Sequence, residues 1–178
     1  SDFINEQFFR DPRLLQILSF LLGRELTPFQ TIHFLQGSEQ RAHSDFIHMS
    51  TEPPGYLIAA WTALEDIDPR NGPLFYYPGS HRLPYLTYQD YAPNPSGLQL
   101  AEYRLYEDRV EKLLREKNLK KETFLAEKGD VLIWHANLLH GGSPIREEGR
   151  TRRSMVAHYF AREVICYHDV SQRPALLG

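Results

Sequence analysis

Residues 129–142 read Gly129-Asp130-Val131-Leu132-Ile133-Trp134-His135-Ala136-Asn137-Leu138-Leu139-His140-Gly141-Gly142. A turn pair leads into the short apolar run Val131–Trp134, which has the length and composition of a buried β-strand. The chain then reaches His140 and two glycines, and glycine lets a backbone approach a ligand closely. We therefore expect a strand that delivers a histidine to the mouth of a β-structure.

Comparable strand signals lie on both sides of this stretch. Apolar runs bounded by glycine or proline predict further strands at Phe29–Leu35, Tyr56–Leu64, Leu74–Tyr77 and Ser154–Tyr159. Pro28 is expected to break the chain just before the first of them. Many short strands, glycine and proline turns and few helices favour an all-β core, a sandwich or a barrel, with helical decoration.

Two segments have helical character. In Asp11–Gly23, a capping aspartate and a proline precede leucines at helical spacing, and a glycine ends the pattern. Glu102–Lys117 carries apolar residues at helical spacing on a charged background, which predicts an amphipathic surface helix. The tyrosines of the segment Tyr85–Tyr106 predict either a lid over a pocket or an insertion packed on the barrel.

Length and composition narrow the functional classes. The 178 residues correspond to one domain, and a net charge of -3 does not favour a nucleic-acid binder. The longest apolar stretch, Leu14–Leu22, is too short and too often interrupted to span a membrane, and Ser1–Arg10 lacks the apolar core of a secretory signal. The single cysteine, Cys166, excludes an internal disulfide and fits a cytoplasmic location.

Three residues could form a metal site. His43 and Asp45 are two positions apart, so on a strand they would project from the same face. With His140 they would supply the two imidazoles and one carboxylate of a non-haem Fe(II) site. Taken singly, a solvated polar pair at a strand edge and a packed histidine explain these residues equally well. His135 would face away from His140, and we expect His158 not to be a ligand.

Arg152 lies just before the last strong strand signal. A guanidinium at this position could reach the same cavity and bind a carboxylate through two parallel hydrogen bonds. The alternative is an arginine at a solvated loop end.

Several short motifs occur in an order that is typical of one protein family. The resemblance covers the chain from about Leu14 to about Phe160. The motifs are His43-Ser44-Asp45-Phe46, Ala60-Trp61-Thr62-Ala63-Leu64-Glu65-Asp66, Asn71-Gly72-Pro73-Leu74, Pro78-Gly79-Ser80-His81 and His140-Gly141-Gly142-Ser143-Pro144, with Arg152 beyond them. In this order they resemble the phytanoyl-CoA dioxygenase family of Fe(II)- and 2-oxoglutarate-dependent oxygenases. The amino-acid sequences of the first and third motifs also resemble those of ectoine hydroxylase, a member with a small polar substrate.

The resemblance implies a mainly β fold, a double-stranded β-helix (jelly roll, cupin-like) with flanking helices. It implies His43, Asp45 and His140 as catalytic iron ligands and Arg152 as the anchor of 2-oxoglutarate. By the same resemblance, Ser143, Trp61 and Gln30 line the co-substrate pocket. The activity implied is hydroxylation of an unactivated C–H bond of a small organic substrate, with O₂ consumed and succinate and CO₂ released. The carboxylate of Asp45 argues for hydroxylation or desaturation over halogenation.

The resemblance also bears on the extent of the domain. Family members usually carry a further stretch ahead of the first matching helix, so we expect residues 1–178 to form one domain whose N-terminal part is missing.

Two other functions remain open from the sequence. The same barrel could bind zinc or another divalent ion as a hydrolase or isomerase, which would not need Arg152. It could also be a non-catalytic binder of small ligands that has lost its chemistry.

Overall fold

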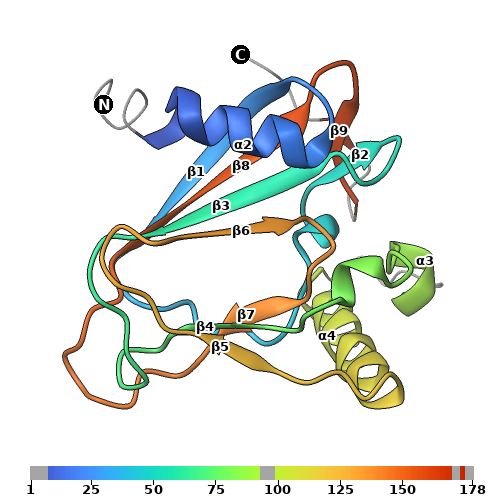
Figure 1. Cartoon of the computed structure of the whole chain (residues 1–178). Helices are drawn as coiled ribbons and strands as arrows, with labels where there is room; N and C mark the ends of the chain where they lie inside the picture. The colour runs from blue at the N-terminus through green and yellow to red at the C-terminus, as the bar shows by residue number, and fades with distance from the viewer. Residues whose placement is uncertain (1–7, 93–98, 170–172, 175–178) are drawn as a thin grey trace.

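The computed structural model describes residues 8–92, 99–169 and 173–174 and is mainly β (Figure 1). The strands are β1 (Leu26–Phe34), β2 (Ser50–Glu52), β3 (Leu57–Ala63), β4 (Leu74–Tyr76), β5 (Glu122–Phe124), β6 (Val131–His135), β7 (His140–Gly142), β8 (Ser154–Ala161), β9 (Ile165–His168) and β10 (Arg173–Pro174). The helices are α2 (Pro12–Leu22), α3 (Tyr88–Tyr91) and α4 (Gln99–Glu116), with short 3₁₀ turns η2 (Asp45–Ile47) and η3 (Ser80–Arg82).

The strands form three sheets in which neighbouring strands are antiparallel. The largest has the order β1-β8-β3-β6, and a smaller sheet, β5-β4-β7, lies across from it (Figure 1). The third sheet, β10-β9-β2, extends one end of the molecule. The space between the first two sheets holds part of the core and the site described below.

Strand β3 shows how the large sheet is buried on both faces. All seven of its residues are buried and all but Thr62 are apolar, as is typical of a strand covered on both faces. Because side chains alternate along a strand, Ile58 and Ala60 pack toward α2, whereas Ala59 and Trp61 pack between the sheets. The large sheet is thus a wall between α2 and the interior.

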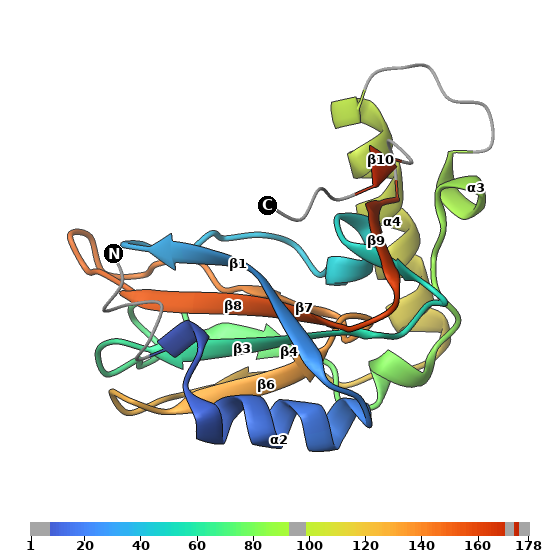
Figure 2. The same ribbon diagram turned by 90° about the horizontal axis from the view of Figure 1, so that it is seen from above.

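Helix α2 covers the outer face of that sheet and begins and ends as predicted (Figure 2). The carboxylate of Asp11 accepts hydrogen bonds from the backbone N–H groups of Arg13 and Leu14, each at 2.9 Å. Gly23 ends the helix with a φ of 71°, which a residue with a side chain rarely adopts.

One prediction about the strands is wrong. Pro28 does not interrupt the chain but lies inside β1, which begins at Leu26. The proline is tolerated because β1 is an edge strand, and its pairing with β8 shifts register between Pro28 and Gln30.

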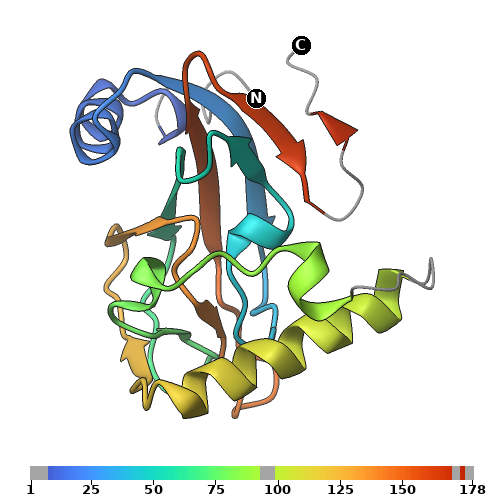
Figure 3. The same cartoon turned by 90° about the vertical axis from the view of Figure 1, so that its right-hand side faces the viewer.

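Helix α4 confirms the predicted amphipathic helix and lies along one end of the molecule (Figure 3). Its Tyr106 and Val110 are fully buried in a core cluster that also contains Tyr91. These contacts favour the packed insertion over a free lid for the described part of the tyrosine-rich segment. Residues 93–98 of that segment lie outside the described residues.

Within the described ranges, no helix combines the length and the apolar character needed to cross a bilayer.

Candidate metal centre and co-substrate cavity

His43 and His140 are brought together by the backbone. The two residues form an isolated antiparallel bridge and exchange two N–H···O bonds of 2.9 Å each. Directly opposed residues in such a bridge hold their side chains close, and the two imidazole ring centres are 4.6 Å apart. Residues almost a hundred positions apart in the sequence thus become neighbours through this bridge.

Asp45 reaches the same point by a route that the sequence did not predict. His43 and Asp45 do not share a strand, because the chain turns into η2 at Asp45. The 3₁₀ turn directs the carboxylate inward, and its Oδ1 lies 3.6 Å from Nε2 of His140. One ligand atom from each of His43, Asp45 and His140 lies within 4.8 Å of the others, and all three residues are buried. The structure therefore gathers the three predicted ligands, although the strand geometry expected for the first two is wrong.

Hydrogen bonds decide which nitrogen of each imidazole faces the cluster. Nδ1 of His43 donates to the carbonyl of Arg41 at 2.9 Å, and Nδ1 of His140 donates to the carbonyl of Leu138 at 3.0 Å. A carbonyl can only accept, so in each neutral ring the proton is on Nδ1. Nε2 of each ring then carries no proton and could bind a metal. A hydrogen bond from the other ring nitrogen to a carbonyl is usual for a histidine that ligates a metal.

Burial and the neighbouring groups favour a neutral imidazole at His43 and an ionised carboxylate at Asp45. Burial, followed by the neighbouring His140, lowers the pKa of His43 to about 4, so its imidazole is neutral at physiological pH. Burial would raise the pKa of Asp45, but the adjacent imidazoles of His140 and His158 outweigh it and hold that pKa below its usual range. Neutral imidazoles and an ionised carboxylate are the forms that coordinate a cation.

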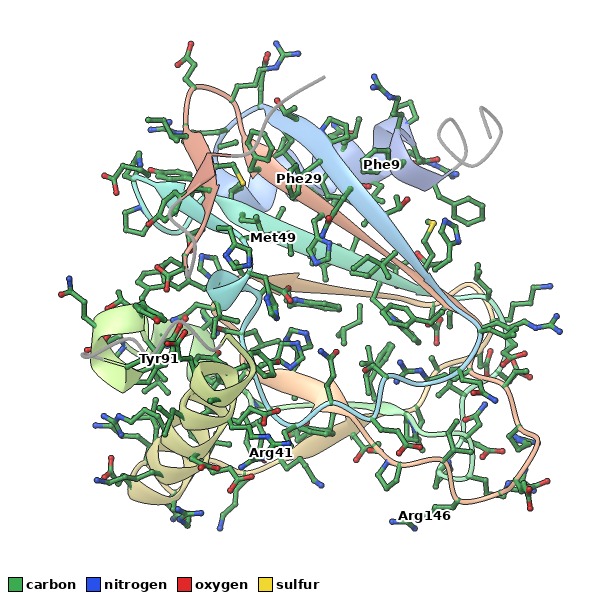
Figure 4. All side chains as sticks on the ribbon, turned by 180° about the vertical axis from the view of Figure 1, so that it is seen from behind. Phe9, Phe29, Arg41, Met49, Tyr91 and Arg146 are labelled. Carbon is green, nitrogen blue, oxygen red and sulfur yellow. The ribbon has the colours of Figure 1, made fainter. Side chains whose placement is uncertain are left out.

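The cluster opens into a cavity of about 300 Å³ between the two facing sheets. Apolar side chains and polar groups line it together, as is typical of small-molecule sites. The lining residues outside the cluster include Gln30, Ile32, Phe34, Ser38, Gln40, His48, Met49, Trp61, Leu74, Trp134, Arg152, Val156 and His158. Figure 4 labels Met49, whose side chain lies between the sheets.

Arg152 lines this cavity and is only 1% exposed, so it is not a solvated loop-end arginine. Nη1 donates to the carbonyl of Gly72 at 2.9 Å, whereas the buried Nε makes no hydrogen bond to any described residue. Burial lowers the pKa of Arg152 to about 10, which leaves the guanidinium charged at neutral pH. A buried cation with unused donors fits an anionic ligand, because burial without a partner is costly.

Two of the other predicted co-substrate residues line the cavity. Trp61 presents a buried Nε1 with no hydrogen-bond partner in the described chain. The amide of Gln30 donates to the sulfur of Met49 at 3.1 Å, a weak acceptor that a ligand could replace. Ser143 is not among the lining residues, and its backbone N–H donates to Pro73 at 2.9 Å.

His158 is a cavity residue that the sequence reasoning missed. It is 2% exposed, neither ring nitrogen makes a hydrogen bond to the described residues, and Nε2 lies 3.5 Å from Oδ2 of Asp45. The even spacing could have found it, because His158 is six residues after Arg152 and the two would share a face of an extended chain. His135, as expected, faces elsewhere, and its Nε2 hydrogen-bonds the carbonyl of Gly55 at 3.0 Å.

Comparisons with known proteins show which family the chain belongs to. The sequence profile of the family described as "Phytanoyl-CoA dioxygenase (PhyH)" matches residues 4–154, most of the chain. The chain belongs to the phytanoyl-CoA dioxygenase family. It is 29% identical over 133 residues to the peroxisomal phytanoyl-CoA dioxygenase of Bos taurus, covering 75% of this chain and 36% of that protein. It is 31% identical over 144 residues to the ectoine dioxygenase of Sphingopyxis alaskensis, covering 75% of this chain and 46% of that protein. The chain therefore spans less than half of the length of either relative.

Solved structures confirm the jelly-roll fold expected for the family. The non-haem α-ketoglutarate-dependent epimerase SnoN from nogalamycin biosynthesis matches with a TM-score of 0.70 and 22% identity, over 93% of this chain and 60% of that one. EctD from S. alaskensis, solved with 2-oxoglutarate and 5-hydroxyectoine, matches with a TM-score of 0.59 and 23% identity, over 93% of this chain and 52% of that one.

Proposed function

We propose that this family member is an Fe(II)- and 2-oxoglutarate-dependent dioxygenase that hydroxylates an unactivated C–H bond of a small organic substrate, releasing succinate and CO₂. One observation carries the proposal: a buried cluster of His43, Asp45 and His140 shares a cavity with the buried guanidinium of Arg152. A hydrolytic metal site needs no such guanidinium, and a ligand binder without chemistry needs no metal-binding cluster. That residues 1–178 act as one domain, and that the protein is cytoplasmic, stay predictions.

The donor set fits iron. Two imidazoles and one carboxylate are the protein ligands of non-haem Fe(II) oxygenases and leave coordination positions open. His43 and His140 would bind through Nε2 and Asp45 through Oδ1. When bound, Fe(II) together with 2-oxoglutarate and O₂ supplies the oxidising power for C–H hydroxylation.

The unpaired donors fit 2-oxoglutarate. Nε of Arg152 and Nε1 of Trp61 are buried N–H groups that make no hydrogen bond within the described ranges. A dicarboxylate offers acceptors for such donors, and the charged guanidinium would anchor the carboxylate farther from the metal. The apolar side chains of Phe34 and Val156 would keep water away from the reacting groups.

The size and lining of the cavity support a small substrate. Its volume of about 300 Å³ is at the lower end of the range usual for small-molecule sites. The primary substrate would enter beside the metal cluster, where Gln30 and His48 offer neutral polar contacts. Burial, followed by the neighbouring His43, lowers the pKa of His48 to about 4, so this contact is uncharged at neutral pH.

An anaerobic binding experiment tests the proposal directly. Addition of Fe(II) and 2-oxoglutarate to the purified protein should produce a weak visible charge-transfer band, and His140→Ala should abolish it. Metal binding by the wild type without any response to 2-oxoglutarate would favour the hydrolase or isomerase alternative. Absence of metal binding would favour a ligand binder without chemistry. A substrate screen that measures succinate and identifies the oxidised product would then name the substrate.

A further inference from the structure

The carboxylate of Asp45 has one oxygen facing the imidazoles and one facing a tryptophan. Oδ1 lies 3.6 Å from Nε2 of His140, whereas Oδ2 accepts a hydrogen bond of 2.7 Å from Nε1 of Trp134. Both partners of that hydrogen bond are buried. A carboxylate that coordinates a metal is ionised, and hydrogen bonds to an ionised acceptor are shorter and stronger than neutral ones.

Trp134 also contacts a second residue of the cluster. Its ring system lies 4.6 Å from the imidazole of His140, centre to centre, at an interplanar angle of 43°. One side chain from β6 therefore touches Asp45, which is on η2, and His140, which is on β7. The three residues come from three different elements, so this contact fixes their relative placement at the metal cluster.

The indole is itself held firmly. Trp134 pairs with Ala59 of β3 across the large sheet and packs in the same core cluster as Trp61 and Val156. A side chain with this support loses little freedom when it donates to Asp45, so its N–H is directed before a metal arrives.

Resting on the metal site of the proposed function, we propose that Trp134 is a positioning residue for the metal centre. Its N–H holds Oδ2 of Asp45, so that the carboxylate presents Oδ1 alone to the metal, and its ring braces the imidazole of His140. His158 approaches the same Oδ2 only to 3.5 Å, which is too long to replace the indole. Phenylalanine at position 134 would fill much of the space but supply no donor.

The chain offers a matched control, because its other tryptophan, Trp61, lines the same cavity without a hydrogen bond to the described residues. Affinity for Mn(II) is measured without 2-oxoglutarate, by the loss of the electron paramagnetic resonance signal of the free ion. Trp134→Phe should weaken Mn(II) binding by about 10- to 100-fold, the usual effect of removing a hydrogen bond behind a metal ligand. Trp61→Phe should change it by less than about threefold.

A second variant separates the hydrogen bond from the shape of the ring. In the Trp61→Phe protein, replacing the remaining tryptophan with benzothienylalanine removes the N–H of residue 134 and keeps a bicyclic ring. This protein should show most of the loss seen in Trp134→Phe, with a urea midpoint of the metal-free protein close to that of Trp61→Phe.

Three outcomes would overturn the inference. They are Mn(II) affinity in Trp134→Phe equal to wild type, an equal loss in Trp61→Phe, or normal affinity in the benzothienylalanine protein. Failure of the proposed function itself is recognised separately, because wild type would then bind no Mn(II) or would lose none of its binding in His140→Ala.

Discussion

The two ends of the cavity differ in how their polar groups are satisfied. At the metal end, the outward-facing atoms of the three predicted ligands are all engaged: Nδ1 of His43, Nδ1 of His140 and Oδ2 of Asp45 each make a hydrogen bond of 3.0 Å or shorter. At the Arg152 end, Nε of Arg152 and Nε1 of Trp61 are buried donors without an acceptor among the described residues. At the first end, the protein itself supplies the hydrogen-bond partners of these atoms. At the second end, the remaining donors fit a ligand that brings acceptors, since buried polar groups are normally paired.

The largest effect is expected from removing a ligand at the metal end. His140→Ala should weaken Mn(II) or Fe(II) binding by more than about 100-fold, because a direct ligand contributes more than the hydrogen bonds behind it. Electron paramagnetic resonance of free Mn(II) measures this change. Unchanged affinity would mean that the metal binds elsewhere.

Arg152→Ala should weaken binding of 2-oxoglutarate without weakening binding of the metal. Each charge-assisted hydrogen bond contributes about 1.5–3 kcal/mol, so loss of the guanidinium should raise the dissociation constant of 2-oxoglutarate at least about tenfold. Metal affinity should stay close to wild type. Titration of the anaerobic visible band measures the co-substrate affinity.

Arg150→Ala is the matched control for that variant. Arg150 is only two residues away, but its guanidinium pairs with Asp68 at 2.9 Å at a half-exposed site. Its removal should leave the affinity for 2-oxoglutarate unchanged. Equal losses in the two variants would contradict a specific role for Arg152.

Ligand binding should also stabilise the fold, by an amount set by the ratio of the ligand concentration to its dissociation constant. At ten times its dissociation constant, 2-oxoglutarate should add about 1.4 kcal/mol to the unfolding free energy of the Mn(II)-loaded protein, since only the folded state binds it. For a chain of this size that is a rise in Tm of about 3–6 °C. In Arg152→Ala at the same concentration, a tenfold weaker affinity should reduce the gain to about 0.4 kcal/mol, a rise in Tm of about 1–2 °C, and an unchanged rise would place the ligand elsewhere.

The smallest effect is expected at Ser143. Its side chain does not line the cavity, so Ser143→Ala should change the affinity for 2-oxoglutarate by less than about twofold. The same titration measures this change. A tenfold loss would show that the serine contacts the co-substrate, as the sequence predicted.

The parts of the fold set by local sequence were predictable, and the parts set by pairing were not. The start and end of α2 follow from Asp11 and Gly23, whose effects act within a few residues. The three predicted ligands, which the structure brings together, were proposed from motif order. The turn at Asp45 was not, because η2 depends on the bridge between His43 and His140 and on contacts with distant strands.

The two residues missed at the site illustrate the same limit. Trp134 was predicted as part of a strand and His158 as a residue outside the ligand set, yet both approach Asp45. Their positions follow from the pairing of β6 with β3 and of β8 with β1 and β3. The alternation of side chains along a strand predicts which residues share a face of the sheet. Which residues of other strands they contact depends on the order and register of the strands.

The segment around Arg41 links the outer helix to the metal cluster. Its guanidinium binds Glu107, Asp108 and Glu111 of α4, and its carbonyl accepts the hydrogen bond from His43 (Figure 4). Tyr106 of the same helix accepts a hydrogen bond from the backbone N–H of Ser44 at 2.8 Å. The helix thus supports the loop that carries two of the three predicted ligands. Substitutions on its solvent-facing side should be tolerated, whereas substitutions on its inner side would shift the proposed metal site without changing a predicted ligand.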